Sequence, residues 1–179
     1  AHDIPVIGEL ELAYRNCKAP FVAITGTNGK TTTTTLTGEL LKKTEKQVFV
    51  GGNIGVPIIS YVADLQKDDV VVAEVSSFQL ETTDSFCPHL ALILNLTPDH
   101  LDRHGDMAGY LAAKAKIFAN QKDSDYLVLN YDDETLRGLE SQSRGKVIFF
   151  SQQHKLEEGV YLDREEIILG WEGKKISIC

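Results

Sequence analysis

Between Phe21 and Phe150, short apolar runs alternate with segments whose apolar residues recur at helical spacing. The runs that predict strands are FVAIT, QVFVG, VVVAEV, LALIL, YLVLN and VIFF. The segments that predict helices are 30–43, one that begins at Pro57, 107–120 and 133–140. Such alternation is typical of an α/β fold with a mostly parallel sheet and helices on both faces. VVVAEV and LALIL are apolar at nearly every position, so we expect both to be central strands.

The two ends of the chain depart from this alternation. Apolar residues spaced three and four apart predict a short lead-in helix within residues 1–20. After Phe150 the apolar runs are interrupted by the turn-forming sequences DREE and EGK, so residues 151–179 predict an antiparallel meander. We see no linker or repeat between 21 and 150 and expect a single domain over 1–179. The chain lacks an initiator Met and stops inside the alternating run KKISIC, so we expect a truncated piece of a longer protein.

Composition narrows the possible classes of protein. The net charge of −8 is opposite to what a non-specific nucleic-acid or anionic-membrane binder needs, so we expect neither partner. The apolar runs are strand-sized, well below the roughly 18 residues of a spanning helix, and we expect a cytoplasmic protein. The three cysteines, Cys17, Cys87 and Cys179, show no metal-binding or disulfide spacing and are expected to be free thiols.

One segment carries the spacing of a phosphate-binding loop. It lies directly after the predicted strand FVAIT and opens the predicted helix 30–43. Glycines let backbone N–H groups point inward, a following Lys can reach phosphates, and the next hydroxyl can bind Mg²⁺. The candidate nucleotide-binding residues are Gly26, Thr27, Asn28, Gly29, Lys30, Thr31 and Thr32. Ile24 occupies the place of the usual first glycine, and an ordinary glycine-containing turn between strand and helix is the alternative.

Four further segments narrow the class. The loop TGTNGKTT is followed by GGNIGVP, EVSSFQLE, NLTPDHLDRHG and YLAAKAKIF. Together these motifs, which extend over about residues 21–130, resemble the Mur ligases and their relative folylpolyglutamate synthase. Their order and the SSFQLE element are most similar to the D-glutamate-adding branch, because diamino-acid-adding relatives show SSHGL there. Folylpolyglutamate synthase differs in its loop, which reads GTNGKGS.

The resemblance implies a phosphate-loop NTPase-like fold and an ATP-dependent, amide-forming ligase. In such enzymes ATP phosphorylates a carboxylate of a UDP-linked muramoyl peptide, and the amine of D-glutamate then attacks the acyl phosphate. Two Mg²⁺ ions would spread the charge of the transferred phosphoryl group. We expect a monomer whose present segment supplies only the core that binds ATP and Mg²⁺. Complete relatives carry domains before and after this core, so we expect weak nucleotide binding and no ligation by the segment alone.

Glu74 and Thr31 are the first candidate metal ligands. Glu74 ends the apolar run VVVAE, at the sheet edge where ligands of open α/β folds collect. The alternative is a solvated carboxylate at the end of a strand. The resemblance assigns Glu74 to magnesium, together with the Thr31 hydroxyl of the loop.

His100 lies in the loop-like segment PDHLDRH and forms an i, i+4 pair with His104. Such a pair can bind zinc, but the Asp-rich surroundings without thiols suit a harder cation. The resemblance places His100 on the second Mg²⁺. For His104 we expect a surface or capping role.

Lys114 lies within an apolar helical stripe formed by Tyr110, Ile117 and Phe118. A buried ammonium must be paired, neutral or modified, although the side chain can instead extend to water. The resemblance implies a carbamate on this lysine, and our hypothesis is that carbamylated Lys114 and His100 hold the second Mg²⁺. With Lys30, these are the candidate catalytic residues. Lys116 is on the other face and expected to be solvated.

Several polar residues leave two readings open. Asn53 and Gln79 match positions that contact substrate in the resembling family, yet each also suits a structural role. For Asn130, Asp132 and Asp133, helix capping is the simpler interpretation. At the level of the whole protein, the alternatives are another amino-acid ligase, a phosphate-loop switch NTPase or a non-catalytic relative.

Overall fold

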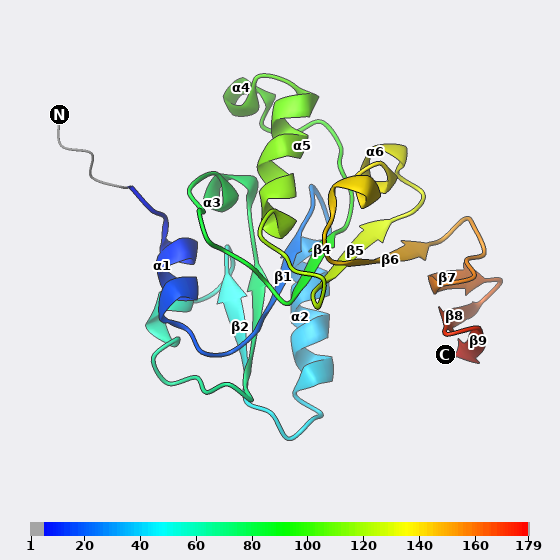
Figure 1. Cartoon of the computed structure of the whole chain (residues 1–179), viewed down its shortest axis with the longest axis horizontal. Coiled ribbons are helices and arrows are strands. Elements are labelled where there is room, and N and C mark those ends of the chain that lie inside the picture. The colour runs from blue at the N-terminus through cyan, green and yellow to red at the C-terminus, as the bar shows by residue number, and fades with distance from the viewer. Residues whose placement is uncertain (1–5, 179) are drawn as a thin grey trace.

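In the computed structural model, which describes residues 6–178, nine strands form one sheet in the order β2-β3-β1-β4-β5-β6-β7-β8-β9 (Figure 1). All pairs from β2 through β7 are parallel, whereas β7–β8 and β8–β9 are antiparallel. The strands are β1 (Phe21–Thr25), β2 (Val48–Gly52), β3 (Val70–Glu74), β4 (Leu90–Ile93), β5 (Tyr126–Asn130), β6 (Lys146–Ser151), β7 (Gly159–Asp163), β8 (Glu166–Trp171) and β9 (Lys174–Ser177). The predicted α/β class and the terminal meander are confirmed.

Helices cover the sheet unequally. The helices are α1 (Glu9–Asn16), α2 (Lys30–Leu41), α3 (Ser77–Glu81), α4 (Leu101–His104), α5 (Met107–Ala115) and α6 (Glu134–Arg137), with short 3₁₀ turns at Ile58–Ser60, Lys116–Phe118 and Glu140–Gln142. The larger core cluster joins α1, α3 and α6 to one face of the sheet through Leu10, Leu80 and Leu136. On the other face a smaller cluster joins Leu41 of α2 to Ile24, Val70 and Val72. Both faces carry helices, as predicted.

β1 lies at the centre of the parallel region, and β3 and β4 flank it. The prediction that VVVAEV and LALIL are central strands is therefore confirmed. β3 is buried along its whole length, in keeping with its continuous apolar sequence. Since parallel strands end at the same sheet edge, the residues after β1, β3 and β4 are brought together there.

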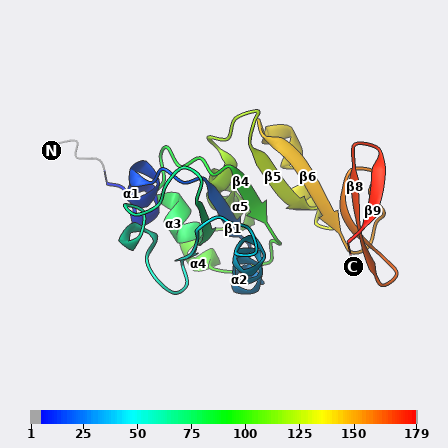
Figure 2. The same ribbon diagram turned by 90° about the horizontal axis from the view of Figure 1, so that it is seen from below.

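The meander extends the sheet away from the helices, as Figure 2 shows for β8 and β9. The strand register places Phe150, Val160, Leu169 and Ile176 side by side in one row across β6 to β9. Their face is the one that α2 covers further along the sheet, but α2 contacts only β1, β2 and β3 closely. Apolar side chains on the meander, including Trp171, are consequently exposed to solvent.

Some predicted helices differ from the structure. The segment from Pro57 forms only a single 3₁₀ turn at Ile58–Ser60, because β-branched residues disfavour a helix and the Ile59 amide donates to Glu9 Oε1 at 2.8 Å. The helix predicted at 107–120 ends at Ala115 and continues as a 3₁₀ turn. Two short helices, α3 and α4, were not predicted.

Among the described residues Cys17 and Cys87 are free thiols, as expected, and Cys179 lies outside them. No helix within residues 6–178 is both long and apolar enough to cross a bilayer.

The predicted lead-in helix, α1, is attached to the body of the domain by a buried carboxylate. Glu11 Oε2 accepts the amides of Asp84 and Phe86 at 3.0 and 3.1 Å, and Oε1 accepts the Ser85 amide and hydroxyl and the Arg15 guanidinium. Burial alone would raise the pKa of Glu11, but the hydrogen bonds outweigh it and lower the pKa from 4.5 to about 2. The ionised form is thus the one that the fold stabilises.

We predict that Glu11→Gln destabilises the fold by about 2 kcal/mol at pH 7, because hydrogen bonds to a buried charge are lost. A lowered pKa gives a contribution that is complete above about pH 4.5 and is lost as the pH falls toward 2. The difference between wild type and variant should therefore shrink in acid, which urea unfolding at pH 7 and near pH 3 would measure. Glu39→Gln, on the exposed face of α2, is the control and should change little. A difference that stays constant with pH would contradict the assignment.

Candidate functional site

The candidate phosphate loop follows β1 and ends at α2. Gly26 and Gly29 have φ of 152° and 81°, and Gly29 is the left-handed residue before the first turn of α2. A β-carbon on Gly26 would lie 3.0 Å from Leu94 Cβ, so the loop approaches β4 too closely for a larger residue. Asn28 is exposed at the tip, and Thr31 and Thr32 are exposed in the first turn of the helix. Amides at the start of α2 thus face the carboxyl edge of the sheet, where anions bind favourably.

Asn95, which directly follows the LALIL run, fixes the conformation of this loop. Its side-chain oxygen accepts the amides of Thr27 at 3.1 Å and Asn28 at 2.8 Å, and its nitrogen donates to the Asn28 carbonyl at 3.0 Å. The Thr27 hydroxyl accepts the Thr97 amide at 3.0 Å. Asn95 was not among the residues predicted for the site, although its place after a central strand beside β1 was the available signal.

Two lysines converge on the loop from different helices. Lys30 Nζ donates to the carbonyls of Gly26 and Thr27 at 3.0 and 2.8 Å. Lys114 Nζ, on α5, donates to the same Gly26 carbonyl at 2.9 Å and lies 4.6 Å from the centre of the Tyr110 ring. The phosphate loop therefore carries two cationic groups at one point, as a site for a polyanion requires.

Lys114 is only 2% exposed. Its ammonium faces the interior, so the alternative in which it extends to bulk water is wrong. Burial is the main cause that lowers the pKa of Lys114 to about 8, the charge of Lys30 adds to it, and Asp99 opposes both. The Lys114 ammonium therefore loses its proton more readily than that of an ordinary lysine.

Glu74, at the end of β3, is 2% exposed and contacts the loop. Its Oε2 accepts the Thr31 hydroxyl at 2.9 Å, and its Oε1 accepts the Asn53 amide nitrogen at 2.9 Å. Hydroxyl and carboxylate oxygens are the ligands that Mg²⁺ prefers, so the side chains of Thr31 and Glu74 fit this cation. The solvated reading of Glu74 is wrong, because the side chain is buried. Within residues 6–178 no three His, Cys, Asp or Glu side chains come together as a metal site.

His100 adopts a left-handed backbone with φ of 52° and precedes α4, so the loop-like segment predicted here is in part helical. Its side chain is 48% exposed, and Nε2 lies 3.4 Å from Asp99 Oδ2. The ring lies 4.8 Å from that of Phe78. An accessible imidazole beside a carboxylate can serve as a cation ligand.

His104 departs from the expected surface or capping role. Its side chain is 3% exposed, Nε2 lies 3.0 Å from Ser77 Oγ, and Nδ1 lies 3.3 Å from Glu81. The ring packs against Phe78 and Tyr110. His104 thus joins α4 to α3, and a polar ring with partners on both nitrogens can be buried at low cost.

A cavity of about 120 Å³ brings the candidate catalytic residues together. It is lined by Lys30, Asn53, Ser76, Ser77, Phe78, Asp99, His100, Tyr110 and Lys114. Thr31 and Glu74 connect to it through Asn53, whose side chain donates to Glu74.

The polar residues with two possible roles are resolved in part. Gln79 uses its side-chain oxygen in a capping box with Ser76 at the start of α3, which favours a structural role for Gln79. Asp133 caps α6, as expected, whereas Asn130 accepts the Asp132 amide.

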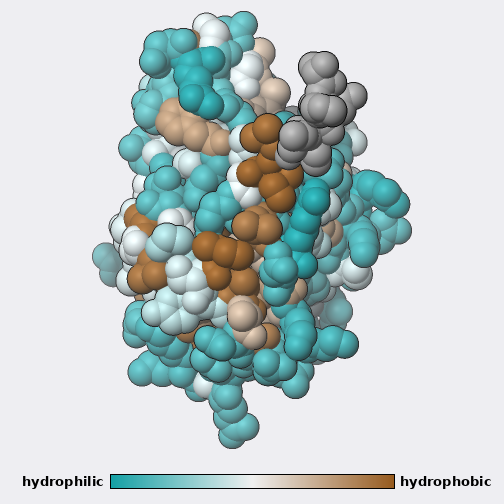
Figure 3. Space-filling model, turned by 90° about the vertical axis from the view of Figure 1, so that its left-hand side faces the viewer, coloured by the Kyte–Doolittle hydropathy of each residue, from teal (hydrophilic) through white to brown (hydrophobic). Residues whose placement is uncertain are grey.

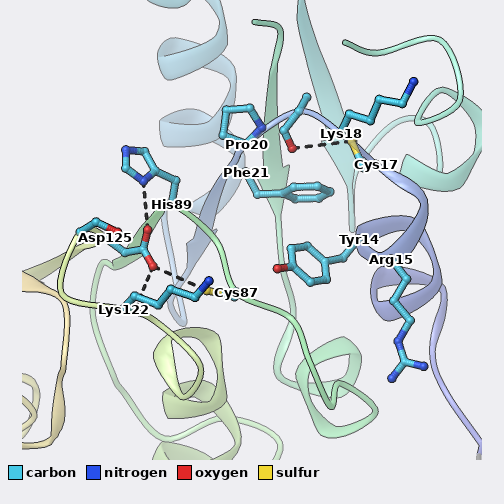
Figure 4. Close-up of a pocket in the computed structure, with 12 residues that line it drawn as sticks. Tyr14, Arg15, Cys17, Lys18, Pro20, Phe21, Cys87, His89, Lys122 and Asp125 are labelled. Carbon is cyan, nitrogen blue, oxygen red and sulfur yellow. Dashed lines mark hydrogen bonds and ion pairs between the residues drawn. The ribbon is translucent and has the colours of Figure 1, made fainter. Parts of the chain in front are cut away.

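A larger cavity, of about 510 Å³, lies at the opposite edge of the sheet, where β1, β4 and β5 begin. In Figure 4, Tyr14 and Phe21 form one side of it, and Asp125 with its partners His89 and Cys87 forms the other. Ligands of open α/β sheets bind outside the carboxyl ends of the strands. The cavity of about 120 Å³ beside the phosphate loop is therefore the candidate site. At the opposite edge, the hydrogen bonds of Asp125 with Cys87 and His89 join the segments that precede β4 and β5.

The fold and the loop define the class: an α/β domain with a phosphate-loop arrangement between β1 and α2. The protein-family model described as the Mur ligase middle domain matches residues 24–179 of the sequence. The chain therefore belongs to the Mur ligase family. A UDP-N-acetylmuramoylalanine–D-glutamate ligase of Pelotomaculum thermopropionicum is 53% identical over 98% of this chain and 39% of its own length. The corresponding Clostridioides difficile ligase is 48% identical over 94% of this chain and 38% of its own length. The chain thus spans about two fifths of the curated relatives it matches.

Solved structures support the same fold. The MurF ligase of Thermotoga maritima in complex with ADP has a TM-score of 0.66 at 21% identity, covering 94% of this chain and 43% of that one. Escherichia coli FolC in complex with DHPP and ADP has a TM-score of 0.63 at 15% identity, covering 98% and 54%. At such identities the likeness is one of fold alone.

We predict that Asn95→Ala in the full-length protein weakens binding of Mg²⁺–ATP by about 10- to 100-fold, because three hydrogen bonds that fix the loop are lost. Titration calorimetry measures this change. Asn120→Ala is the matched control, since that amide donates to the carbonyls of Asp84 and Phe86 far from the loop. Equal affinity in wild type and Asn95→Ala would contradict a loop-fixing role.

Proposed function

We propose that this chain is the ATP-binding core of a ligase that joins D-glutamate to UDP-N-acetylmuramoyl-L-alanine in peptidoglycan precursor synthesis. The curated relatives bear that activity in their names and are 48–53% identical over nearly the whole chain. The observation that carries the proposal is the convergence of Lys30, His100 and Lys114 on one cavity beside the loop. We also propose that the protein acts in the cytoplasm as a monomer, without nucleic-acid or membrane partners, consistent with its charge of −8.

Each residue has a role in this proposal. The amides of residues 26–32 and the Lys30 ammonium hold the phosphates of ATP. Thr31 and Glu74 would hold Mg²⁺, which would supply positive charge to balance that of the phosphates. A carboxylate oxygen of the nucleotide-linked substrate attacks the terminal phosphorus, and ADP leaves. The amine of D-glutamate then attacks the acyl carbon, forming the amide and releasing phosphate.

We propose in addition that Lys114 carries a carbamate. The neutral amine attacks the carbon of CO₂, a C–N bond forms, and one proton passes to solvent. A pKa of about 8 supports this step, because it leaves neutral amine available. The product replaces a buried cation with an anion, and with His100 it would hold a second Mg²⁺. The carbamate N–H can keep the bond to the Gly26 carbonyl.

The alternatives differ in what they require. Another amino-acid ligase of the family would prefer a different amino acid. A phosphate-loop switch would release phosphate from ATP without any acceptor. We expect the full-length protein to release phosphate only when UDP-N-acetylmuramoyl-L-alanine is present, and to form the amide only with D-glutamate among D-glutamate, L-lysine and diaminopimelate. Phosphate release that does not depend on the acceptor would contradict the ligase proposal.

We predict that Lys114→Ala in the full-length protein reduces kcat by at least about 100-fold, in the range of lost metal ligands or transition-state charge partners. Short-chain carboxylates should restore part of the activity, because they can supply the missing anionic oxygens. Lys116→Ala, on the exposed side of the same helical segment, is the control. In wild type, ¹³C-bicarbonate should give a carbamate signal that Lys114→Ala lacks. An unchanged kcat, or no carbamate signal in the active enzyme, would contradict this role.

A further inference from the structure

A third cavity, of about 390 Å³, lies on the other side of the phosphate loop. Asn28, Gly29 and Thr33 of the loop and α2 line it, together with the ends of β4, β5 and β6. The sheet order β3-β1-β4-β5-β6 places this cavity on the side of β1 away from Glu74. Phosphates held by the loop would therefore have the metal ligands on one side and this cavity on the other.

The wall furthest from the loop is formed by Gln152 and Gln153, which follow β6. Both are exposed, and each carboxamide offers one acceptor and two donors. Such groups can bond to the polar edge of a nucleobase or to ribose hydroxyls. Exposed glutamines contribute to binding only if the backbone that carries them is held in place.

Asp132, two residues after β5, holds that backbone. Its Oδ2 accepts the Gln152 amide at 2.8 Å, and its Oδ1 accepts the Ser151 hydroxyl at 2.5 Å and lies 3.0 Å from His154 Nδ1. The Ser151 hydroxyl in turn accepts the amides of Gln153 and His154 at 3.1 and 2.8 Å. One carboxylate thus fixes the whole turn 151–154.

Asp132 is itself fixed and charged. Its side chain is 11% exposed, and its amide donates to Asn130 Oδ1 at 3.0 Å. Burial favours the neutral acid, but the hydrogen bonds from Ser151, His154 and Gln152 prevail and lower the pKa of Asp132. Asn130 Nδ2 also donates to the Leu94 carbonyl at 3.3 Å, so the ends of β4, β5 and β6 are linked.

The geometry points to Asp132 as a positioning residue that holds Gln152 and Gln153 against the nucleoside part of the nucleotide whose phosphates occupy the loop. This inference rests on the proposed ATP-dependent function. Asp132 itself does not touch the reacting atoms. It acts through the turn, so its loss should affect recognition of the nucleoside and leave the phosphate loop and the acceptor site intact.

The test compares Asp132→Asn with wild type in the full-length ligase. Asparagine keeps the shape but presents an N–H₂ group where one carboxylate oxygen accepted, and it removes the charge. We expect the KM for ATP to rise about 10-fold, equivalent to about 1.4 kcal/mol, with kcat within about 2-fold. The KM for UDP-N-acetylmuramoyl-L-alanine and the inhibition constant of inorganic tripolyphosphate, which has no nucleoside, should stay unchanged. The preference for ATP over GTP should fall.

The sheet supplies a matched control. At its opposite edge, Asp125 is also 11% exposed and lies 3.0 Å from Nδ1 of His89, which Figure 4 shows beside the far cavity. Asp125→Asn should leave the KM for ATP unchanged. The double variant Gln152→Ala/Gln153→Ala, which keeps the Asp132 turn, should reproduce the rise in KM even if Asp132→Asn folds poorly.

Each outcome decides the inference. A rise in KM for ATP in Asp132→Asn and in the double variant, with tripolyphosphate inhibition unchanged, supports it. An unchanged KM for ATP in the double variant overturns it, as does equal weakening of ATP and tripolyphosphate in Asp132→Asn, which indicates a general structural role. A wild-type protein that neither binds ATP nor forms the amide would instead overturn the proposed function, independently of the variants.

Discussion

The carbonyl oxygen of Gly26 accepts hydrogen bonds from both Lys30 and Lys114. Two like charges on one acceptor repel each other, which contributes to the lowered pKa of Lys114. The arrangement persists because the loop is held independently, by Asn95 and by the close approach of Gly26 to Leu94. A loop that carries two lysine ammonium groups suits an anion. The proposed nucleotide binding and the proposed carbamylation of Lys114 would both depend on this arrangement and on the burial of Lys114, which is the main cause of its lowered pKa.

The strands and the loop could be predicted because they depend on local patterns. Apolar runs marked β1, β3 and β4, and the order of the parallel strands placed Lys30 and Glu74 at one edge. The helical spacing of Tyr110, Ile117 and Phe118 placed Lys114 within an apolar stripe, but it left open whether the ammonium is buried or extends to water. α3 had a readable signal, since Ser76 and Gln79 form a capping box at the expected spacing. α4 had none, because a four-residue helix after a left-handed His100 has too little periodicity.

Pairings between distant residues were beyond sequence reasoning. His104 is polar and lies in an Asp-rich segment, so its burial depends on Ser77 and Glu81, over 20 residues away. Asn95 reaches back 67 residues to Asn28, and Asp132 reaches forward to a turn near residue 152. Only the sheet order creates these contacts.

The lining of the cavity beside the loop separates reaction class from substrate identity. Its lining of Lys, His and hydroxyl groups suits charge stabilisation during the proposed phosphoryl transfer. None of these residues distinguishes one incoming amino acid from another. The geometry therefore supports the proposed acyl-phosphate chemistry, whereas the proposal of D-glutamate rests on relatives that bear that name and are 48–53% identical to this chain.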